Sequence, residues 1–257
     1  MGQPLSSNFN YDNAQEFIIT KYIYENYFLR HYDKKMGWTS QLVVDKETQL
    51  SGADIISYQT PFLYRTIDLK AQATYINSPT NTFAFEIMYG GDKEGWLINN
   101  NLKTTCYGLV WIWDAVKAQN IQANDILLTE FMMLNKRMLL KLLNDNGITP
   151  FYMKKVAKFM VDHGIDRIKY GDKINAEINI PKSDICQSIC FTKSSQLYEN
   201  PVNIVIRKDI LLKICDSICI FNNKMFYENK YIWKNYDKNI NKKGFIKNWD
   251  KRVLNQK

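Results

Sequence analysis

Two acidic residues and one lysine stand out in this sequence because their spacing would bring them to one point. Asp54 begins one apolar run, and Asp68 and Lys70 lie two apart in a second apolar run fourteen positions later. Residues two apart in a β-strand point to the same face, which puts Gln72 beside Asp68 and Lys70. The alternate side chains then face a core: Ile67, Leu69 and Ala71. Two carboxylates and an ammonium group at one point suit metal-assisted attack of water on a phosphodiester bond.

Asp-x-Lys and Glu-x-Lys sequences are common, and the chain holds two others, at 33–35 and 228–230. Both lie in polar or basic surroundings without an upstream Gly-x-Asp, whereas Asp68-Leu69-Lys70 lies within an apolar strand that follows Gly52-Ala53-Asp54. Two plainer interpretations stay open. Asp54 can belong to a turn after Gly52, and Asp68 and Lys70 can form an ion pair on a solvated sheet, which contributes little.

The surrounding sequence predicts the elements that position these residues. Residues 13–31 form an amphipathic pattern with Glu16 in its first turn and Arg30 and His31 near its end, which predicts a helix. Turn-forming residues then separate a series of runs with strand character, at 39–44, 53–58, 63–75, 82–89, 95–98 and 106–113.

The second half of the chain predicts both helices and strands. Three-and-four spacing of apolar residues over 124–147 predicts a helix, and Thr149-Pro150 with Gly164 predicts another between them. His163 at that helix end is expected to be a surface residue that complements the helix dipole. Strands are predicted at 167–170, 174–180, 185–191 and 202–206, and a further helix at 209–218.

The order helix, strand, strand with an acid, strand with acid-x-Lys resembles the core of the PD-(D/E)xK nuclease superfamily. The resemblance covers residues 12–115, and the run Asp68-x-Lys70-x-Gln72 is similar to that of several members. Glu16 is placed like the helix acid that often completes their metal site, with Glu25 a less attractive candidate. Glu86, in the run at 82–89, is a separate site candidate, or an exposed strand residue. The proline of the family name is absent, since Ala53 precedes Asp54.

This resemblance implies an α/β fold: a restriction-endonuclease-like core at 1–120 with a mixed central β-sheet flanked by helices. Additional helices and strands at 121–221 would pack on or complete that core, and 222–257 would be a basic, aromatic-rich extension, helical or irregular. The implied activity is hydrolysis of DNA with Mg²⁺ or Mn²⁺. Its catalytic residues would be Asp54, Asp68, Lys70 and Gln72, and its metal ligands Glu16, Asp54 and Asp68.

Two alternatives come from other functional classes. The first is a non-catalytic nucleic-acid-binding or assembly protein on the same fold. The second is a metal-free interaction protein whose acids are surface residues; burial of Asp54 beside Asp68 would argue against it, because unpaired acids are not buried together without a cation. A homodimer is compatible with the nuclease hypothesis, since two active sites would cut both strands.

The positive charge of the chain is concentrated near its C-terminal end. Of a net charge of +8, residues 222–257 supply +7, from nine lysines and one arginine against three acids. Aromatic residues interleave with the lysines, as in surfaces that follow phosphates and stack on bases. We therefore expect DNA contact through Lys230, Lys234, Lys242, Lys243 and Lys247. The alternative is an A/T-rich coding bias, which enriches Lys, Asn, Ile and Tyr without selection for binding.

Other classes are disfavoured by what the sequence lacks. No apolar run approaches the ~20 residues that span a bilayer, and the first residues lack a secretory pattern, so we expect a cytoplasmic protein without membrane association. The absence of Gly-x4-Gly-Lys-Ser/Thr argues against a nucleotide cofactor. The cysteine pairs 186/190 and 215/219 have a spacing that zinc permits. They lie among isoleucines, however, and we expect reduced, buried thiols there.

Overall fold

The computed structural model describes residues 9–175, 177–194 and 199–228, which form an α/β fold around two β-sheets. The larger sheet of this described part has seven strands, in the order β1 (Thr39–Leu42), β2 (Ile55–Thr60), β3 (Leu63–Ala71), β6 (Cys106–Ala115), β7 (Ile126–Asn135), β11 (Cys215–Phe221) and β12 (Phe226–Glu228). The smaller has five, in the order β5 (Lys93–Glu94), β4 (Thr82–Tyr89), β10 (Val202–Arg207), β9 (Ile189–Lys193) and β8 (Arg167–Lys169).

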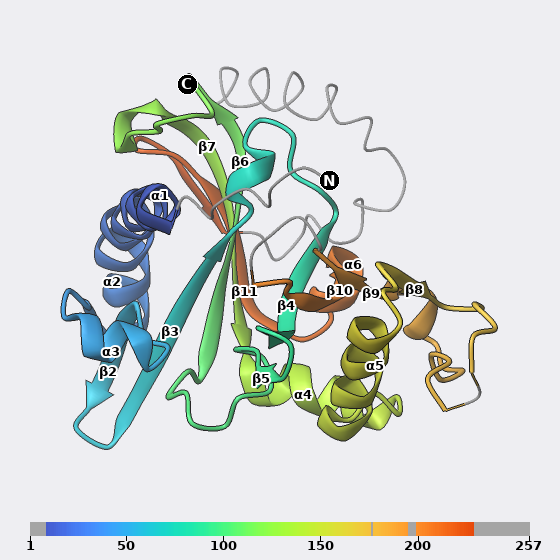
Figure 1. Ribbon diagram of the computed structural model, residues 1–257. Helices are drawn as coiled ribbons and strands as arrows, with labels where there is room; N and C mark the ends of the chain where they lie inside the picture. The colour runs from blue at the N-terminus through green and yellow to red at the C-terminus, as the bar shows by residue number, and fades with distance from the viewer. Residues whose placement is uncertain (1–8, 176, 195–198, 229–257) are drawn as a thin grey trace.

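The larger sheet is mixed, because β3 runs parallel to β6 while its other neighbours are antiparallel. Helix α1 (Phe9–Ile23) lies on one side of it, and the smaller sheet lies on the other with α4 (Lys136–Asp145) and α5 (Pro150–Asp162) (Figure 1). The predicted α/β class and mixed central sheet with helices are therefore confirmed.

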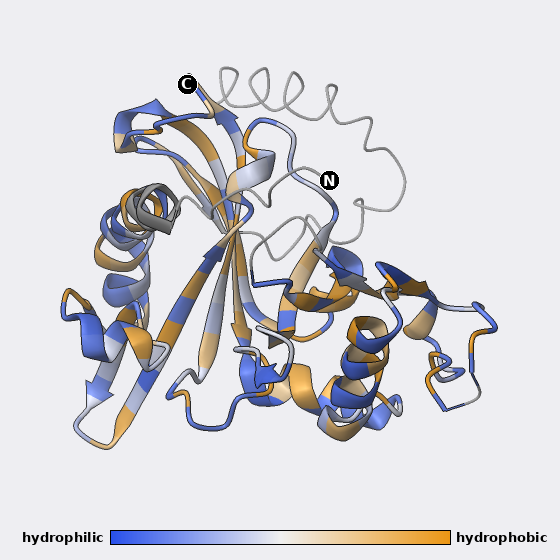
Figure 2. Cartoon of the chain, viewed as in Figure 1, coloured by the Kyte–Doolittle hydropathy of each residue, from blue (hydrophilic) through white to orange (hydrophobic). Residues whose placement is uncertain are grey.

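Two hydrophobic cores lie on opposite faces of the larger sheet. Ile67 and Leu69 of β3 are buried in the core beneath α1, whereas Tyr107 of β6 is buried in the core between the two sheets. Hydrophilic and hydrophobic residues alternate along β3 (Figure 2). Asp68 pairs with Tyr107 in the parallel register, so Asp68 and Lys70 point away from Ile67 and Leu69, as predicted.

The first helical segment is longer and less regular than predicted. In place of one helix at 13–31, α1 continues as a π-helix, η1 (Tyr24–Tyr32), and then as α2 (Asp33–Met36). Gly37 ends the run at φ +65°, a left-handed conformation that suits glycine, and its N–H donates to the Asp33 carbonyl at 2.9 Å. A π-helix of this length is rare.

Two predicted helices are wrong in large part. Most of 124–147 is strand β7 followed by the shorter helix α4, and most of 209–218 is a short helix, α6 (Lys208–Leu211), followed by strand β11. Strand β7 lies between β6 and β11 and is buried on both faces from Thr129 to Leu134. A strand covered on both faces is apolar at nearly every position, so periodicity cannot separate it from a helix.

Other predictions met mixed outcomes. Helix α5 is confirmed, with the Thr149 hydroxyl accepting from the Tyr152 N–H at its start and Gly164 at φ +65° after its end. The predicted strand at 174–180 is wrong, since the residues described there form turns, and the strand at 63–75 ends early in a 3-10 turn, η2 (Ala73–Tyr75). The strand predicted at 82–89 is confirmed as β4, which belongs to the smaller sheet, whereas the strand predicted at 95–98 is wrong, since β5 covers only Lys93–Glu94 and residues 96–98 form a turn.

A buried ion pair joins the two sheets. The Lys208 ammonium lies 2.8 Å from a Glu130 carboxylate oxygen, and both residues are almost completely buried. The indole N–H of Trp113 donates to the same carboxylate at 2.7 Å, and the ammonium lies 4.0 Å from the centre of the Trp111 ring. Lys208 and Glu130 are therefore shielded from water, and each compensates the buried charge of the other.

Across the described ranges, no helix combines the length and apolar character that a bilayer span requires. The five lysines predicted to contact DNA lie outside the described residues.

Candidate active site

The backbone holds Asp54 in place from both sides. Its N–H donates to the carbonyl of Ile67 at 2.9 Å, and its own carbonyl accepts from the N–H of Val43 at 2.8 Å. One carboxylate oxygen accepts from the Leu69 N–H at 2.7 Å. Asp54 directly precedes β2, so the first residue of the predicted pair is fixed to the strand that carries the second.

Gly52 makes this approach possible. It adopts φ +83°, and a Cβ placed there would collide with the Thr104 hydroxyl oxygen, which also donates to the Gly52 carbonyl at 2.7 Å. Both the backbone conformation and the space available therefore require glycine two residues before Asp54.

Gly52→Ala should accordingly lower the free energy of unfolding by about 2–3 kcal/mol, since a left-handed alanine costs about 1–2 kcal/mol before any collision is counted. Gly91→Ala is the matched control, because Gly91 has φ +92° but no atom within 4 Å of the added Cβ. It should lose about 1 kcal/mol, for the backbone alone. Urea denaturation measures both, and equal losses would show that the Thr104 contact carries no weight.

Asp68 and Lys70 form an ion pair at the base of a pocket. The Asp68 residue is only 4% exposed, and its carboxylate oxygen lies 2.8 Å from the Lys70 ammonium. That ammonium also lies 5.4 Å from the centre of the Trp96 ring. Burial alone would lower the pKa of Lys70, but the charge of Asp68, followed by those of Glu16 and Asp54, raises it above its ordinary value. Lys70 is therefore a permanent cation.

The surroundings of Asp54 favour its neutral form, whereas those of Lys70 favour its charged form. Burial and then the negative charge of Asp68 raise its pKa from 3.8 to about 7, although Lys70 and the Leu69 N–H partly oppose this. The carboxyl groups of Asp54 and Asp68 thus both lie within the electrostatic influence of the Lys70 ammonium. Asp68 is buried and Asp54 is half-buried beside it, as expected of a site and not of surface acids.

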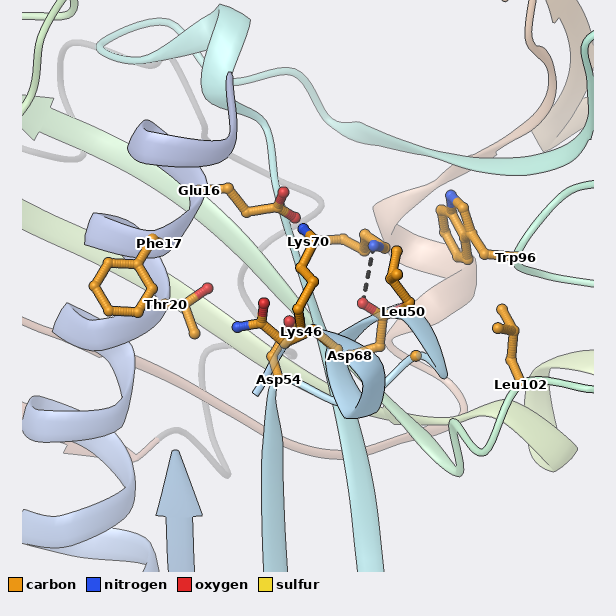
Figure 3. A pocket seen from close by; sticks show the side chains of 12 residues that line it. Glu16, Phe17, Thr20, Lys46, Leu50, Asp54, Asp68, Lys70, Trp96 and Leu102 are labelled. Carbon is orange, nitrogen blue, oxygen red and sulfur yellow. Dashed lines mark ion pairs between the residues drawn. The ribbon is translucent and has the colours of Figure 1, made fainter. Parts of the chain in front are cut away.

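The pocket above these residues has a volume of about 290 Å³. Glu16 enters it from α1, and Lys46 and Leu50 enter from the short helix α3 (Lys46–Leu50) (Figure 3). Glu16 is exposed and points toward Lys46 and Lys70 across the pocket (Figure 3). The structure therefore brings together Glu16, Asp54, Asp68 and Lys70 of the predicted residues.

Gln72 lies elsewhere. It does not line this pocket. Its amide holds the next turn instead, because its side-chain oxygen accepts from the Thr80 N–H at 2.9 Å and its nitrogen donates to the Thr80 hydroxyl at 3.0 Å. Gln72 leaves the strand face because β3 ends at Ala71. Gln72 therefore stabilises the connection between β3 and β4.

The two further acids considered from sequence differ in position. Glu25 lies 3.9 Å from Lys21 on the helix surface and does not line the pocket. Glu86 of β4 is half-buried, and burial raises its pKa to about 7, against the influence of the Lys70 charge and a backbone N–H of Trp96. Glu86 therefore lies close to the ion pair, from the side of the smaller sheet.

Three residues at the pocket were not foreseen: Trp96 lines it, and Lys136 and Tyr107 hold the turn that carries Trp96. The Lys136 ammonium donates to the carbonyls of Trp96 and Asn99 at 3.3 and 3.2 Å, and the Tyr107 hydroxyl donates to the Trp96 carbonyl at 3.1 Å. Burial lowers the pKa of Lys136, although the Asp68 charge opposes this. Together they fix the turn that places Trp96 beside Lys70. Lys136 and Trp96 lie 40 positions apart, and no local pattern signals their contact.

The donor set fits a hard divalent cation, which prefers oxygen ligands. Asp54 and Asp68 offer carboxylates, and the Leu69 carbonyl points toward the Asp54 side, because the N–H and C=O of one strand residue point to the same neighbouring strand. In the described part of the chain, no three His, Cys, Asp or Glu side chains form a ready-made cluster. The fit therefore rests on two carboxylates, one carbonyl and water, with Glu16 across the pocket.

The raised pKa of Asp54 predicts a dependence of stability on pH in metal-free buffer. Between about pH 4 and 7 the unfolded chain has lost a proton that folded Asp54 keeps, so stability falls as pH rises through this window. Asp54→Asn lacks this cost and should melt about 2–6 °C higher than wild type above pH 7, with no difference near pH 4. Mg²⁺ or Mn²⁺ should raise the melting temperature of wild type only. Melting curves with EDTA and with metal measure both effects, and a lower Asp54→Asn melting temperature above pH 7 would contradict the prediction.

His163 and the paired cysteines lie outside the candidate pocket. His163 is exposed at the end of α5 and stacks on Phe159, as expected for a surface histidine. Cys186 and Cys219 are buried, while Cys190 and Cys215 are half-buried. Strands β9 and β11, which carry Cys190 and Cys215, belong to different sheets.

Comparisons of the chain with protein-family models, with curated proteins and with solved structures find no match. What supports a function is therefore the site itself, in which half-buried Asp54 lies beside the buried Asp68–Lys70 ion pair at the base of an open pocket.

Proposed function

We propose that this chain is a metal-dependent deoxyribonuclease that hydrolyses phosphodiester bonds in the Asp54–Asp68–Lys70 pocket. The observation that carries the proposal is the position of Asp54, directly before β2, beside the Asp68–Lys70 ion pair of β3, with Asp68 4% exposed. A carboxyl group whose pKa is raised by burial and by a neighbouring charge, in a pocket open to solvent, is typical of functional sites. Asp54 beside Asp68 argues against the metal-free interaction protein.

Asp54, Asp68 and the Leu69 carbonyl would hold Mg²⁺ or Mn²⁺, with Glu16 near enough to add an oxygen through water. When bound there, the metal would activate water and neutralise charge on the phosphate. Lys70 is fixed by Asp68 and remains protonated, so it would donate to the phosphoryl oxygens as negative charge develops on them. Trp96, held by Lys136 and Tyr107, would keep the Lys70 side chain in this orientation.

The order of elements supports assignment to the PD-(D/E)xK superfamily. A helix precedes an antiparallel group of three strands, β1 to β3, and β6 then lies parallel to the strand that carries Asp68 and Lys70. The connection between β3 and β6 departs from the family pattern, because it contains β4 and β5 of the second sheet in place of a helix.

The test is cleavage of linear, circular and single-stranded DNA with Mg²⁺, Mn²⁺ or EDTA, by wild type and by Asp68→Ala. Metal-dependent cleavage that is lost in the variant is the expected result. If folded wild-type protein cuts none of these substrates with either metal, the catalytic proposal is wrong and the non-catalytic nucleic-acid-binding alternative takes its place.

A further inference from the structure

A second and larger hollow lies along the outer face of the smaller sheet. Its volume is about 1010 Å³, and its floor is formed by residues that alternate with core residues on three neighbouring strands. These floor residues are small or polar: Thr82, Ala84, Cys190, Thr192, Asn203 and Val205. We call this hollow the β4–β10–β9 groove.

The charged residues that line the groove are all basic. Arg167, Lys169 and Arg207 line it, whereas no Asp or Glu is among the 21 described residues that do so. The bias is local, because residues 1–221 carry 24 basic against 23 acidic side chains. Arg207 pairs with Asp209 at 2.7 Å, which leaves exposed Arg167 and Lys169 of β8 as the main source of positive potential. A polyanion is the complementary occupant.

Two aromatic residues stand at the same groove. Tyr75 is 51% exposed, and Tyr170 follows directly after β8. Cations that follow a phosphate backbone, combined with aromatic rings on which bases stack, are the usual means of binding single-stranded nucleic acid. Base pairs in a duplex stack on each other, so their faces are not accessible to Tyr75 and Tyr170.

The groove adjoins the candidate active site along two strands. On β3, Lys70 lines the candidate pocket, while the next residues, Ala71 on the opposite face of the strand and Gln72 after its end, line the groove. On β4, Glu86 lies within the influence of the Lys70 charge, while Ala84, two residues away on the same face, lines the groove. The linings of the pocket and the groove therefore meet near the end of β3, at Lys70 and Ala71.

We infer that the β4–β10–β9 groove binds one strand of DNA and leads it to the Asp54–Asp68–Lys70 pocket. Arg167 and Lys169 contact its phosphates, and Tyr75 and Tyr170 stack on its bases. The inference rests on the proposed nuclease function for its direction toward the pocket, but binding in the groove does not require cleavage.

The test compares full-length wild type with Arg167→Gln/Lys169→Gln, in EDTA so that no DNA is cut. The control is Lys141→Gln/Lys158→Gln, which removes the same charge from the exposed surfaces of α4 and α5. Affinity for a fluorescent oligodeoxythymidine and for a duplex of equal length is measured against salt concentration. The groove variant should bind the single strand at least tenfold more weakly, with a salt slope reduced by about 0.7 per lost phosphate contact. The control should stay within twofold of wild type.

A position-specific readout accompanies the affinities. Photocrosslinking of a bromouracil-substituted strand should give adducts in the peptides that contain Tyr75 or Tyr170. Wild-type affinity in the groove variant, equal affinity of wild type for duplex and single strand, or adducts confined to 229–257 would each overturn the inference. Cleavage with Mg²⁺ separates the two proposals. Weakened binding with no cleavage by wild type supports the groove and rejects the nuclease, whereas cleavage with unchanged binding rejects only the groove.

Discussion

Lys70→Ala should cut DNA at least about 10²–10³-fold more slowly than wild type, the usual cost of removing one preorganised donor to developing charge. The same variant should bind Mg²⁺ or Mn²⁺ as tightly as wild type or more tightly. The reason is that the Lys70 ammonium lies 2.8 Å from Asp68 and competes with a metal for that carboxylate. Single-turnover cleavage at saturating metal and calorimetric metal titration measure the two effects separately.

This separation distinguishes a catalytic lysine from a structural one. Asp68→Asn should lose both cleavage and metal affinity, because it removes a ligand. Lys141→Ala is the matched control, since it removes an exposed lysine on α4, and it should leave both quantities unchanged. If Lys70→Ala lost metal affinity as severely as Asp68→Asn, Lys70 would be a support for the carboxylates and its assigned role would be wrong.

Lys208→Met should destabilise the protein by about 3–5 kcal/mol, because it leaves Glu130 buried without a cation. Glu130→Gln in the same background should restore at least half of that loss. The glutamine is neutral and still offers an oxygen to the Trp113 N–H, which donates to Glu130 at 2.7 Å in wild type. Urea denaturation of wild type, both single variants and the double variant gives the coupling free energy.

A double variant less stable than Lys208→Met would contradict this account, since it would mean that the Glu130 charge itself stabilises the fold. The pair lies on the opposite side of β6 from β3, outside the candidate pocket. Metal affinity of the double variant should therefore stay at the wild-type value, which separates loss of stability from loss of the site.

The positions of Asp68 and Lys70 on one strand face could be predicted better than the fold as a whole, for a physical reason. Alternation along a strand is local, so Asp68 and Lys70 could be assigned to one face and Ile67 and Leu69 to the other. The Gly-x-Asp pattern of Gly52 and Asp54, upstream of Asp68 and Lys70, supplied a second local signal. Helix α5 was predictable for the same reason, since its N-cap residue and the glycine after its end are both local in the sequence.

What could not be predicted depends on long-range contacts. The sequence of β7 favours a helix because both faces of the strand are covered, one by each core, and burial of both faces removes the strand period. Gln72 was expected to continue the strand face, but β3 stops one residue earlier and the amide binds Thr80. Lys136 and Trp96 come into contact only when α4 and β5 are both in place, and no local sequence spacing predicts this contact.

The two cores set the time at which the site can form during synthesis. Ile206 and Ile218 contribute to one core, and Cys219 and Phe221 contribute to the other, so neither core is complete before about residue 221 has left the ribosome. Asp54, Asp68 and Lys70 are synthesised well before β11, which lies between β7 and β12 in the sheet that orients them. A nascent chain would therefore contain all three side chains before it contains the completed sheet and cores that hold them together.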